Sequence, residues 1–303
     1  MTELTDFQRE ISRLLPDIKL LFQEPMTKHT SFRIGGPAEV MAFPENADQL
    51  SAILKVSAVL DIKPAIIGAG TNILAPDEGL PGLVICLKDN LSAVEKLDEC
   101  HIRADAGASM TKTAVFAANA GLSGLEFAHG IPGSVGGGVY MNAGAYGGEI
   151  KDVLVSAEVM TYDGVLHTYT ADEMEFSYRH SRLEEEPGIV VAAVFCLTAK
   201  PVEEIRSYMQ ELAAKRKASQ PLDKPSAGSA FKRPVGGYAA ALIDQSGLKG
   251  YQVGGAAISE KHAGFAVNMG GATAEDVKNL LHQVSQIVYE KTGILLEPEV
   301  RIW

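Results

Sequence analysis

Glycine is concentrated in one stretch of the chain, where it could bring the backbone close to a ligand. Ten of the 30 glycines lie between Gly121 and Gly148. An ordered glycine loses more conformational entropy than other residues, so this density needs a physical reason. Without β-carbons, successive main-chain N–H groups can converge on phosphate oxygens in an anion-binding nest. The stretch therefore predicts a phosphate-containing ligand; tight packing without a ligand is the alternative.

A second glycine motif comes earlier in the chain, directly after an apolar segment. Gly68-Ala69-Gly70-Thr71-Asn72 follows residues 63–67, which we expect to form a buried strand. Ile73 stands where a dinucleotide-binding fingerprint needs its third glycine, and the sequence has no G-x-x-x-x-G-K-[ST] phosphate loop. The motif therefore predicts no Rossmann unit, and a tight strand-to-loop turn would also explain it.

Taken in order, segments covering residues 27–301 resemble the UDP-N-acetylenolpyruvoylglucosamine reductase family. The segments are Thr30-Ser-Phe-Arg-Ile-Gly-Gly-Pro37, Gly68-Ala-Gly-Thr-Asn-Ile-Leu74, Gly124-Leu-Glu-Phe-Ala-x-Gly-Ile-Pro-Gly-Ser-Val-Gly-Gly137, Met141-Asn-Ala-Gly-Ala145, Ser177-Tyr-Arg-x-Ser181, Ala227-Gly-Ser-x-Phe-Lys-x-Pro234, Leu248-Lys-Gly250, Gly254-Gly-Ala256 and Glu297-Pro-Glu-Val-Arg301. Several pieces would be weak alone, but the combination is specific.

The resemblance implies an α+β protein with non-covalently bound FAD. The flavin domain is expected to have the vanillyl-alcohol-oxidase (PCMH) type of fold in two subdomains, followed by an α+β substrate-binding domain. NADPH is the implied hydride donor. The expected FAD-binding residues are those of the glycine motifs: Gly68, Ala69, Gly70, Thr71, Asn72, Ile73, Gly124, Gly130, Ile131, Pro132, Gly133, Ser134, Gly136, Gly137, Asn142, Ala143, Gly144 and Ala145.

The implied reaction is reduction of UDP-N-acetylglucosamine enolpyruvate to UDP-N-acetylmuramate, a step of peptidoglycan precursor synthesis. The family's catalytic residues match Arg179, Ser229 and Glu299 without substitution. Hydride addition to the enol ether builds negative charge on the neighbouring carboxylate. Each hydrogen-bond donor placed on such charge increases the reaction rate by roughly 10²–10³-fold. We expect Arg179 and Glu299 to stabilise this charge and Ser229 to deliver the proton. Taken singly, each has an ordinary reading as an ion-pair, turn or solvent-facing residue.

The resemblance places three further residues near the substrate. Lys249 is expected near the diphosphate or the reacting carboxylate, with Tyr178 and Lys232 nearby. A solvated lysine is the alternative for both cations. The interval between Arg179 and Ser229 is too short for the tyrosine-bearing loop of the longer subclass, so the chain resembles the shorter subclass.

Histidine and cysteine residues give no metal or covalent-flavin signal. His129 lies inside the glycine stretch, where we expect it to line the loop without being attached to the flavin. Cys86, Cys100 and Cys196 are far apart in the sequence and match no metal-ligand spacing. We expect free thiols and no metal site.

Helix and strand patterns are mixed without regular alternation, which favours α+β over a doubly wound sheet. Helices are expected near 6–15, after the caps Asn46 and Ser109, and over 202–218, 237–245 and about 277–292. Asp163-Gly164 predicts a two-residue hairpin turn. The expected domains are an FAD-binding region over 1–200 (subdomains near 1–88 and 89–200), a substrate-binding domain over 201–293, and a strand over 294–303 that carries Glu299.

Composition excludes several classes of function. Hydrophobic residues make up 46 % and charged residues 21 %, which is ordinary for a globular protein, and the net charge is -11. An acidic protein repels nucleic acid phosphates and anionic membranes, so we expect neither as a partner. The N-terminal segment lacks signal-peptide features and no apolar run could span a membrane, which predicts a cytoplasmic protein. We also expect no obligate protein partner.

Two other functions remain open at this stage. An oxidase of the same flavin fold would pass electrons to oxygen, but it would not need the segments around Arg179, Ser229 and Glu299. A non-catalytic flavin- or nucleotide-binding module would be expected to lack the acid or the cation, and neither is lost.

Overall fold

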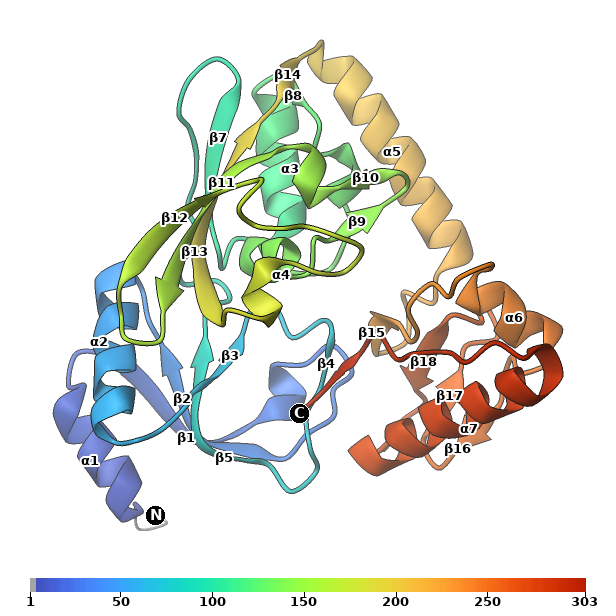
Figure 1. Ribbon diagram of the computed structural model, residues 1–303, viewed down its shortest axis with the longest axis horizontal. Helices are drawn as coiled ribbons and strands as arrows, with labels where there is room; N and C mark the ends of the chain where they lie inside the picture. Colours follow the sequence, from blue (N-terminus) through green and yellow to red (C-terminus); the bar gives the residue numbers. More distant parts are fainter. Residues whose placement is uncertain (1–3) are drawn as a thin grey trace. The chain divides into compact units, whose positions relative to one another are not determined.

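The computed structural model describes residues 4–303 (Figure 1). Residues 1–3 lie outside the described residues. They belong to the N-terminal segment that lacks signal-peptide features. Two compact units share the chain. Of the described residues, the first holds 4–22, 39–69 and 82–215, and the second holds 23–38, 70–81 and 216–303. Neither unit is a continuous stretch of sequence.

One sheet, most of which lies in the first unit, is covered by N-terminal helices. Its strand order is β1-β2-β5-β3, with β1 at Lys19–Pro25, β2 at Pro37–Phe43, β5 at Leu80–Cys86 and β3 at Ala65–Ile67. β3 and β5 are parallel. The helices are α1 (Asp6–Leu14) and α2 (Ala47–Val59), and Asn46 caps α2 as predicted. Buried Leu50, Ile53 and Leu54 place α2 in the same core as the sheet.

A five-stranded sheet forms a second part of the first unit and supports the glycine-rich stretch. Its order is β12-β11-β13-β7-β6, with β12 at Leu166–Thr170, β11 at Leu154–Thr161, β13 at Gly188–Cys196, β7 at His101–Asp105 and β6 at Val94–Lys96. The short helix α4 (Val135–Tyr140) contacts β13 and β7, and α3 (Met110–Asn119) contacts α4 (Figure 1). Ser109 caps α3 as predicted.

Two short strand pairs flank this sheet. β9 (Gly144–Ala145) pairs with β10 (Gly148–Glu149), and β8 (Leu122–Ser123) pairs with β14 (Thr198–Ala199). The predicted hairpin of β11 and β12 is confirmed, but its turn is longer than two residues. Thr161 N donates to the Val165 carbonyl at 2.9 Å, which leaves Tyr162, Asp163 and Gly164 in the loop. Gly164 has φ 82°, the left-handed residue that a three-residue hairpin loop requires.

The second unit packs two helices and a small sheet around one apolar core. The sheet order is β15-β18-β17-β16, with β15 at Ser226–Ser229, β18 at Phe265–Asn268, β17 at Ala256–Ile258 and β16 at Gln252–Val253. The helices are α6 (Ala239–Gln245) and α7 (Ala274–Thr292). α7 contributes buried Val277, Leu280, Leu281, Val284 and Val288, as its apolar period predicts. Gly293 ends α7 with φ 72°.

Long-range pairs draw two early segments into the second unit. β4 (Ile73–Leu74) pairs in parallel with β19 (Arg301–Ile302), and Ser31 Oγ donates to the Ser226 carbonyl at 2.6 Å. The expected division into continuous stretches near residues 88, 200 and 293 therefore differs from the observed units. α5 (Val202–Ser219) crosses from one unit to the other at residue 215. Composition along the chain cannot reveal such pairings, because they join residues more than 190 positions apart.

The expected strand over 294–303 is mostly wrong. Only Arg301–Ile302 form a strand there. Ile294–Val300 instead make single contacts: the Phe231–Pro298 bridge and two main-chain bonds near it. The strand is short because its partner β4 has only two residues, Ile73 and Leu74.

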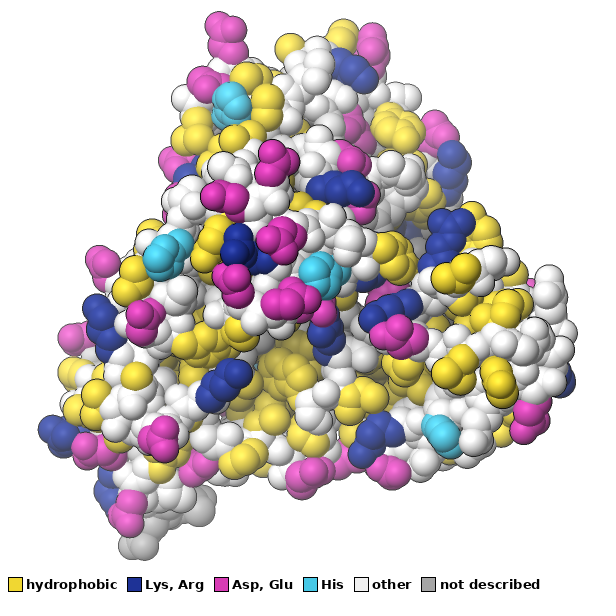
Figure 2. Space-filling view, in the orientation of Figure 1, with side chains coloured by type: hydrophobic (Ala, Val, Ile, Leu, Met, Phe, Trp, Pro, Cys, Tyr) yellow, Lys and Arg dark blue, Asp and Glu magenta, His cyan; other side chains and the backbone are white. Residues whose placement is uncertain are grey.

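The surface carries the acidic charge in dispersed form. Figure 2 shows acidic and basic side chains interspersed over the visible face. Within residues 4–303, no helix is long and apolar enough to cross a membrane.

Candidate functional site

Two glycine-containing loops that are far apart in the sequence meet within the first unit. Gly68 follows β3, and Ser134 is the N-cap of α4. A β-carbon on Gly68 would lie 2.2 Å from Ser134 Oγ, so any side chain here would displace the Ser134 hydroxyl. The structure thus brings the 68–69 turn to the glycine-rich stretch, as a shared ligand would require. The remaining residues of the early motif, Gly70 to Ile73, belong to the second unit.

Packing explains part of the glycine density. A β-carbon on Gly136 would meet the Ala106 β-carbon at 2.8 Å, and one on Gly138 would meet Met110 Sδ at 2.8 Å. The Gly136 N–H donates to the Ala106 carbonyl at 2.8 Å, so it is already used inside the protein. Gly136 therefore serves close packing, although the sequence predicts a phosphate contact. Gly137 differs, because it is exposed and its β-carbon would make only ordinary contacts.

The glycine-rich stretch contains a buried polar atom without a partner. His129 Nδ1 is shielded from solvent, and no hydrogen-bond partner lies within its reach among the described residues. Such atoms are rare in folded proteins unless a ligand or water satisfies them. This orphan nitrogen, together with the Gly68 approach, fits a stretch that binds a polar group such as the flavin nucleotide. The main chains around Gly68, His129 and exposed Pro132 are the parts that would hold it.

Asn142 connects the glycine-rich stretch to the segment that carries Arg179. Its side chain is fully buried. Nδ2 donates to Glu149 Oε2 at 2.8 Å and to the Ser177 carbonyl at 3.0 Å, and Oδ1 accepts from Lys151 N at 3.0 Å. Both N–H bonds of this amide are thus used inside the protein. We assign Asn142 a positioning role, which its place in the motif did not reveal.

Arg179 lies against the carbonyl edge of the same stretch. Its Nη2 donates to the Gly144 carbonyl at 3.2 Å, and its guanidinium carbon lies 5.0 Å from the centroid of the Tyr178 ring. Fully buried Ser181 anchors the segment, because its Oγ donates to the Tyr140 carbonyl at 2.7 Å. Arg179 also has φ 56°, an uncommon conformation for a residue with a side chain and one that clusters at functional sites. Two separate sequence motifs therefore converge in one place.

Replacing Asn142 is expected to loosen this connection. Asn142→Ala removes three hydrogen bonds and leaves buried partners unsatisfied, so we expect a loss of about 2–4 kcal/mol in the free energy of unfolding. Substrate reduction should also slow, because Arg179 loses the anchor of its segment. Urea unfolding and steady-state kinetics measure the two effects. Asn90→Ala is the matched control: Asn90 Nδ2 is buried and has no partner in the described part of the chain, so its removal should cost under about 1 kcal/mol. Equal losses in the two variants would contradict the role of Asn142.

Ser229 and Glu299 come together within the second unit. Ser229 ends β15 opposite Phe265 and is exposed. The next residue, Ala230, accepts a hydrogen bond from Glu299 N at 2.9 Å. Gly228 before Ser229 has φ 78°, which turns the strand just ahead of the serine. Two of the three predicted catalytic residues are thus held by one main-chain contact.

Asn72 holds Glu299 from the other side. Its Nδ2 donates to the Glu299 carbonyl at 3.1 Å, and its own carbonyl accepts from Arg301 N at 2.9 Å. Glu299 is half-buried between these contacts. The side chain of Asn72, expected at the flavin, is therefore engaged with the main chain of a predicted catalytic residue.

The expected substrate-binding cations form surface ion pairs in the second unit. Lys232 pairs with Glu297, and Lys249 Nζ lies 2.7 Å from Asp244 Oδ2. All four side chains are substantially exposed, and exposed pairs contribute only about 0–1 kcal/mol. An incoming phosphate or carboxylate could replace either partner at little cost.

His262 is a residue near Ser229 that sequence reasoning missed. Its Nδ1 accepts from Gly264 N at 3.1 Å, and the Gly264 carbonyl accepts from Ala230 N at 2.8 Å. The ring also packs edge-on against Phe265 at 5.0 Å. Burial lowers the pKa of His262 below its ordinary value of 6.5, and the charge of Lys249 adds to this effect. The neutral form is required, since a proton on Nδ1 would break the bond from Gly264.

The pH dependence of stability should report His262. Because its folded-state pKa is lowered, the unfolded chain binds a proton that the folded chain does not as pH falls below about 6.5. The free energy of unfolding should therefore fall through this range, until pH reaches the lowered pKa. His262→Gln should remove that part of the acid dependence in urea unfolding. His282→Gln on the exposed face of α7 is the control. A His262→Gln profile parallel to the wild-type profile would refute the linkage.

Family models match both ends of the chain. The model described as "FAD binding domain" matches residues 38–170. The model described as "UDP-N-acetylenolpyruvoylglucosamine reductase, C-terminal domain" matches residues 220–303. The first match contains Gly68 and the whole glycine-rich stretch, and the second contains Ser229 and Glu299.

Full-length relatives and solved structures agree with these matches. A UDP-N-acetylenolpyruvoylglucosamine reductase of Agathobacter rectalis is 51 % identical, covering 98 % of both chains. One from Caldanaerobacter subterraneus is 45 % identical over 97 % of this chain and 96 % of the relative. The crystal structure of the Thermus caldophilus reductase has a TM-score of 0.80 at 38 % identity, covering 94 % of this chain and 98 % of that one. An alkyldihydroxyacetonephosphate synthase, at TM-score 0.50 and 18 % identity over 65 % of this chain and 41 % of its own, is similar in fold alone.

The fold and the glycine loops define an FAD-dependent oxidoreductase with a vanillyl-alcohol-oxidase-type flavin domain, which confirms the expected α+β class and the expected cofactor. Within that class, the chain belongs to the UDP-N-acetylenolpyruvoylglucosamine reductase family.

Proposed function

We propose that this protein reduces the enol ether double bond of UDP-N-acetylglucosamine enolpyruvate to give UDP-N-acetylmuramate, with NADPH as the hydride donor. The observation that carries the proposal is that the Arg179 segment and the glycine-rich stretch meet in the first unit. The Arg179 guanidinium donates to the Gly144 carbonyl of that stretch. Two proteins named as this reductase are 51 % and 45 % identical to this chain over nearly its full length, which supports the assignment of the substrate. The same support favours a reductase over an oxidase or a non-catalytic flavin module.

The glycine loops are proposed to hold FAD non-covalently. Gly68 and Ala69 would contribute main chain beside Ser134, and His129 Nδ1 would gain the partner that it lacks among residues 4–303. Bound FAD supplies hydride transfer from the nicotinamide to the enol ether. What remains for the protein is to orient the substrate, to stabilise charge and to provide a proton.

Arg179 and Glu299 are proposed to stabilise the charge that develops on the substrate carboxylate. A guanidinium cation offers planar N–H donors that match a carboxylate. The main chain of Glu299 is held by Asn72 and Ala230, so the side chain leaves the backbone at a defined place. Fixed groups of this kind cost no reorganisation during the reaction, which is the reason they accelerate it.

Ser229 is proposed to deliver the proton to the α-carbon. Its hydroxyl is exposed at the end of β15, and Gly228 turns the chain just before it. A serine hydroxyl is a weak acid, but an enediolate carbon is a strong base. A positioned proton donor increases the rate of such a step by roughly 10²–10⁴-fold.

Lys249, Lys232 and Tyr178 are proposed to bind the diphosphate and carboxylate groups of the substrate. The two lysines would exchange Asp244 and Glu297 for substrate oxygens. A cytoplasmic location and independence of other proteins are parts of the same proposal.

Product analysis tests the proposed function. The purified protein is incubated with the enolpyruvyl substrate and either NADPH or NADH, and the sugar nucleotide is analysed by mass spectrometry. We expect product heavier by two hydrogen atoms, formed faster with NADPH. Unchanged substrate with both donors, despite bound flavin, would refute the proposal.

A further inference from the structure

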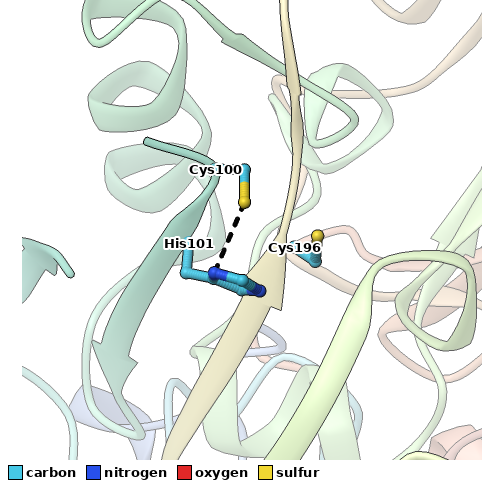
Figure 3. Close-up of side chains that lie close together, drawn as sticks. All are labelled: Cys100, His101 and Cys196. Atoms are coloured by element: carbon cyan, nitrogen blue, oxygen red, sulfur yellow. Dashed lines mark hydrogen bonds between the residues drawn. The ribbon is translucent and has the colours of Figure 1, made fainter. Parts of the chain in front are cut away.

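Three side chains with metal-binding atoms meet on the first unit (Figure 3). They are Cys100 and His101, at the turn between β6 and β7, and Cys196, at the end of β13. The antiparallel register sets His101 opposite Cys196, and Leu197 N donates to the Cys100 carbonyl at 2.8 Å. The sequence predicts no metal site because the two cysteines lie far apart. Sheet pairing removes that separation.

The distances suit a tetrahedral ion. The sulfur atoms of the two cysteines and a ring nitrogen of His101 all lie within 4.8 Å of one another. Cys100 Sγ lies 3.4 Å from His101 Nδ1. With zinc bonds of about 2.3 Å to sulfur and about 2.0 Å to nitrogen, a tetrahedral site separates S from N by about 3.5 Å and S from S by about 3.8 Å. Side-chain rotations that move the ligand atoms by about an ångström or less would therefore complete the tetrahedral geometry.

Asp98 supplies a carboxylate at the same turn. Its Oδ1 accepts from the N–H groups of Cys100 at 2.9 Å and His101 at 2.8 Å, which holds the turn in shape. Its Oδ2 lies 2.8 Å from His101 Nδ1. One ring nitrogen cannot both donate to a carboxylate and bind a metal, so zinc bound at Nδ1 would replace this contact. The carboxylate would then be placed to become the fourth ligand.

We propose that Cys100, His101 and Cys196 form a zinc-binding site, with the carboxylate of Asp98 completing it. Two thiolates and an imidazole select zinc over magnesium or calcium, which prefer oxygen ligands. The site is accessible, since Cys196 is exposed and the other two residues are half-buried. The net charge of -11 favours the approach of a cation.

Bound zinc would fasten the β6–β7 turn to the end of β13. Cys196 leads through Leu197 into β14, which pairs with β8 directly ahead of Gly124. Cys196 of the site is therefore separated by one residue from the strand that pairs with the start of the glycine-rich stretch. We expect zinc to stabilise the folded protein, because an ion that binds only the folded chain shifts the unfolding equilibrium.

The test uses the full, FAD-loaded protein, reduced and freed of metal by chelation. Zinc chloride alone is added, and metal content is measured after dialysis by elemental analysis and native mass spectrometry. We expect one zinc per chain, slower alkylation of Cys100 and Cys196, and a rise in melting temperature on the order of 5 °C at saturating zinc. No retained zinc, or loss of both thiols to a Cys100–Cys196 disulfide without zinc uptake, would overturn the proposal.

Variants separate this site from adventitious binding. Cys100→Ser and Cys196→Ser should each lower zinc affinity by at least about 100-fold, because changes outside the ligands already cost 10–100-fold. Asp98→Asn should lower the affinity by at least about 10-fold, because it removes the charge of the carboxylate that completes the site. Cys86→Ala and His282→Ala are matched controls that should keep full affinity: Cys86 is buried elsewhere in the unit, and His282 lies in the other unit. Full affinity in Cys196→Ser would also overturn the proposal. Metal content is read without an activity assay, so the result stands apart from the proposed function.

Discussion

Ser229→Ala is expected to leave flavin reduction by NADPH near its wild-type rate and to slow flavin reoxidation by the enolpyruvyl substrate by roughly 10²–10⁴. The first half-reaction forms no enediolate and so needs no acid at Ser229. The second half-reaction must protonate the α-carbon, and the variant has no positioned donor. Stopped-flow absorbance of the flavin follows both half-reactions separately.

The local structure allows a clean control for this variant. Ser226 lies on the same strand, and the bond that it makes to Ser31 uses its main-chain carbonyl. Ser226→Ala should therefore leave both half-reactions unchanged. Equal slowing of both half-reactions in Ser229→Ala would mean that the serine only holds the site together. Unchanged reoxidation would remove Ser229 from the mechanism.

Arg179→Ala is expected to slow reoxidation by the substrate by roughly 10²–10³, the usual loss when a donor to developing charge is removed. The variant should still bind FAD, because Asn142 and Ser181 hold the segment independently of the Arg179 side chain. Alanine must adopt the same left-handed backbone as arginine at φ 56°, so the backbone cost is similar in both proteins. Flavin occupancy after gel filtration and stopped-flow reoxidation measure the two properties.

Arg182→Ala is the matched control for Arg179. It removes a cation three residues away that donates to the Glu173 carbonyl at 2.8 Å and pairs with Glu186. We expect near wild-type reoxidation in this variant. If Arg179→Ala instead lost its flavin and recovered activity on reconstitution, Arg179 would be structural. Loss of the same size in both variants would indicate a general charge effect.

Local signals in the sequence predicted the local structure well. Asn46 and Ser109 cap helices as expected, and Gly293 ends the long C-terminal helix in the left-handed conformation. These features depend on neighbouring residues and on the helical period, both of which can be read along the chain. The resemblance also predicted the cofactor and the family.

Features that depend on tertiary pairing could not be predicted in this way. The grouping of residues 23–38 and 70–81 with the C-terminal unit rests on pairs such as β4 with β19. The same limit hid the positioning roles of Asn72 and Asn142, whose partners lie elsewhere in the chain. The density of glycine was only partly diagnostic of a ligand site. At Gly136 and Gly138 a side chain would collide with Ala106 and Met110, and neighbours in the sequence do not reveal these contacts.

The most direct test of the central claim is an anaerobic absorbance titration of the purified protein. We predict an oxidised-flavin spectrum that bleaches on addition of NADPH and returns on addition of the enolpyruvyl UDP-sugar, with one UDP-N-acetylmuramate formed per NADPH consumed. FAD should then be released into solution when the protein is denatured. A bleached spectrum that the substrate leaves unchanged, and that only oxygen restores, would contradict the account.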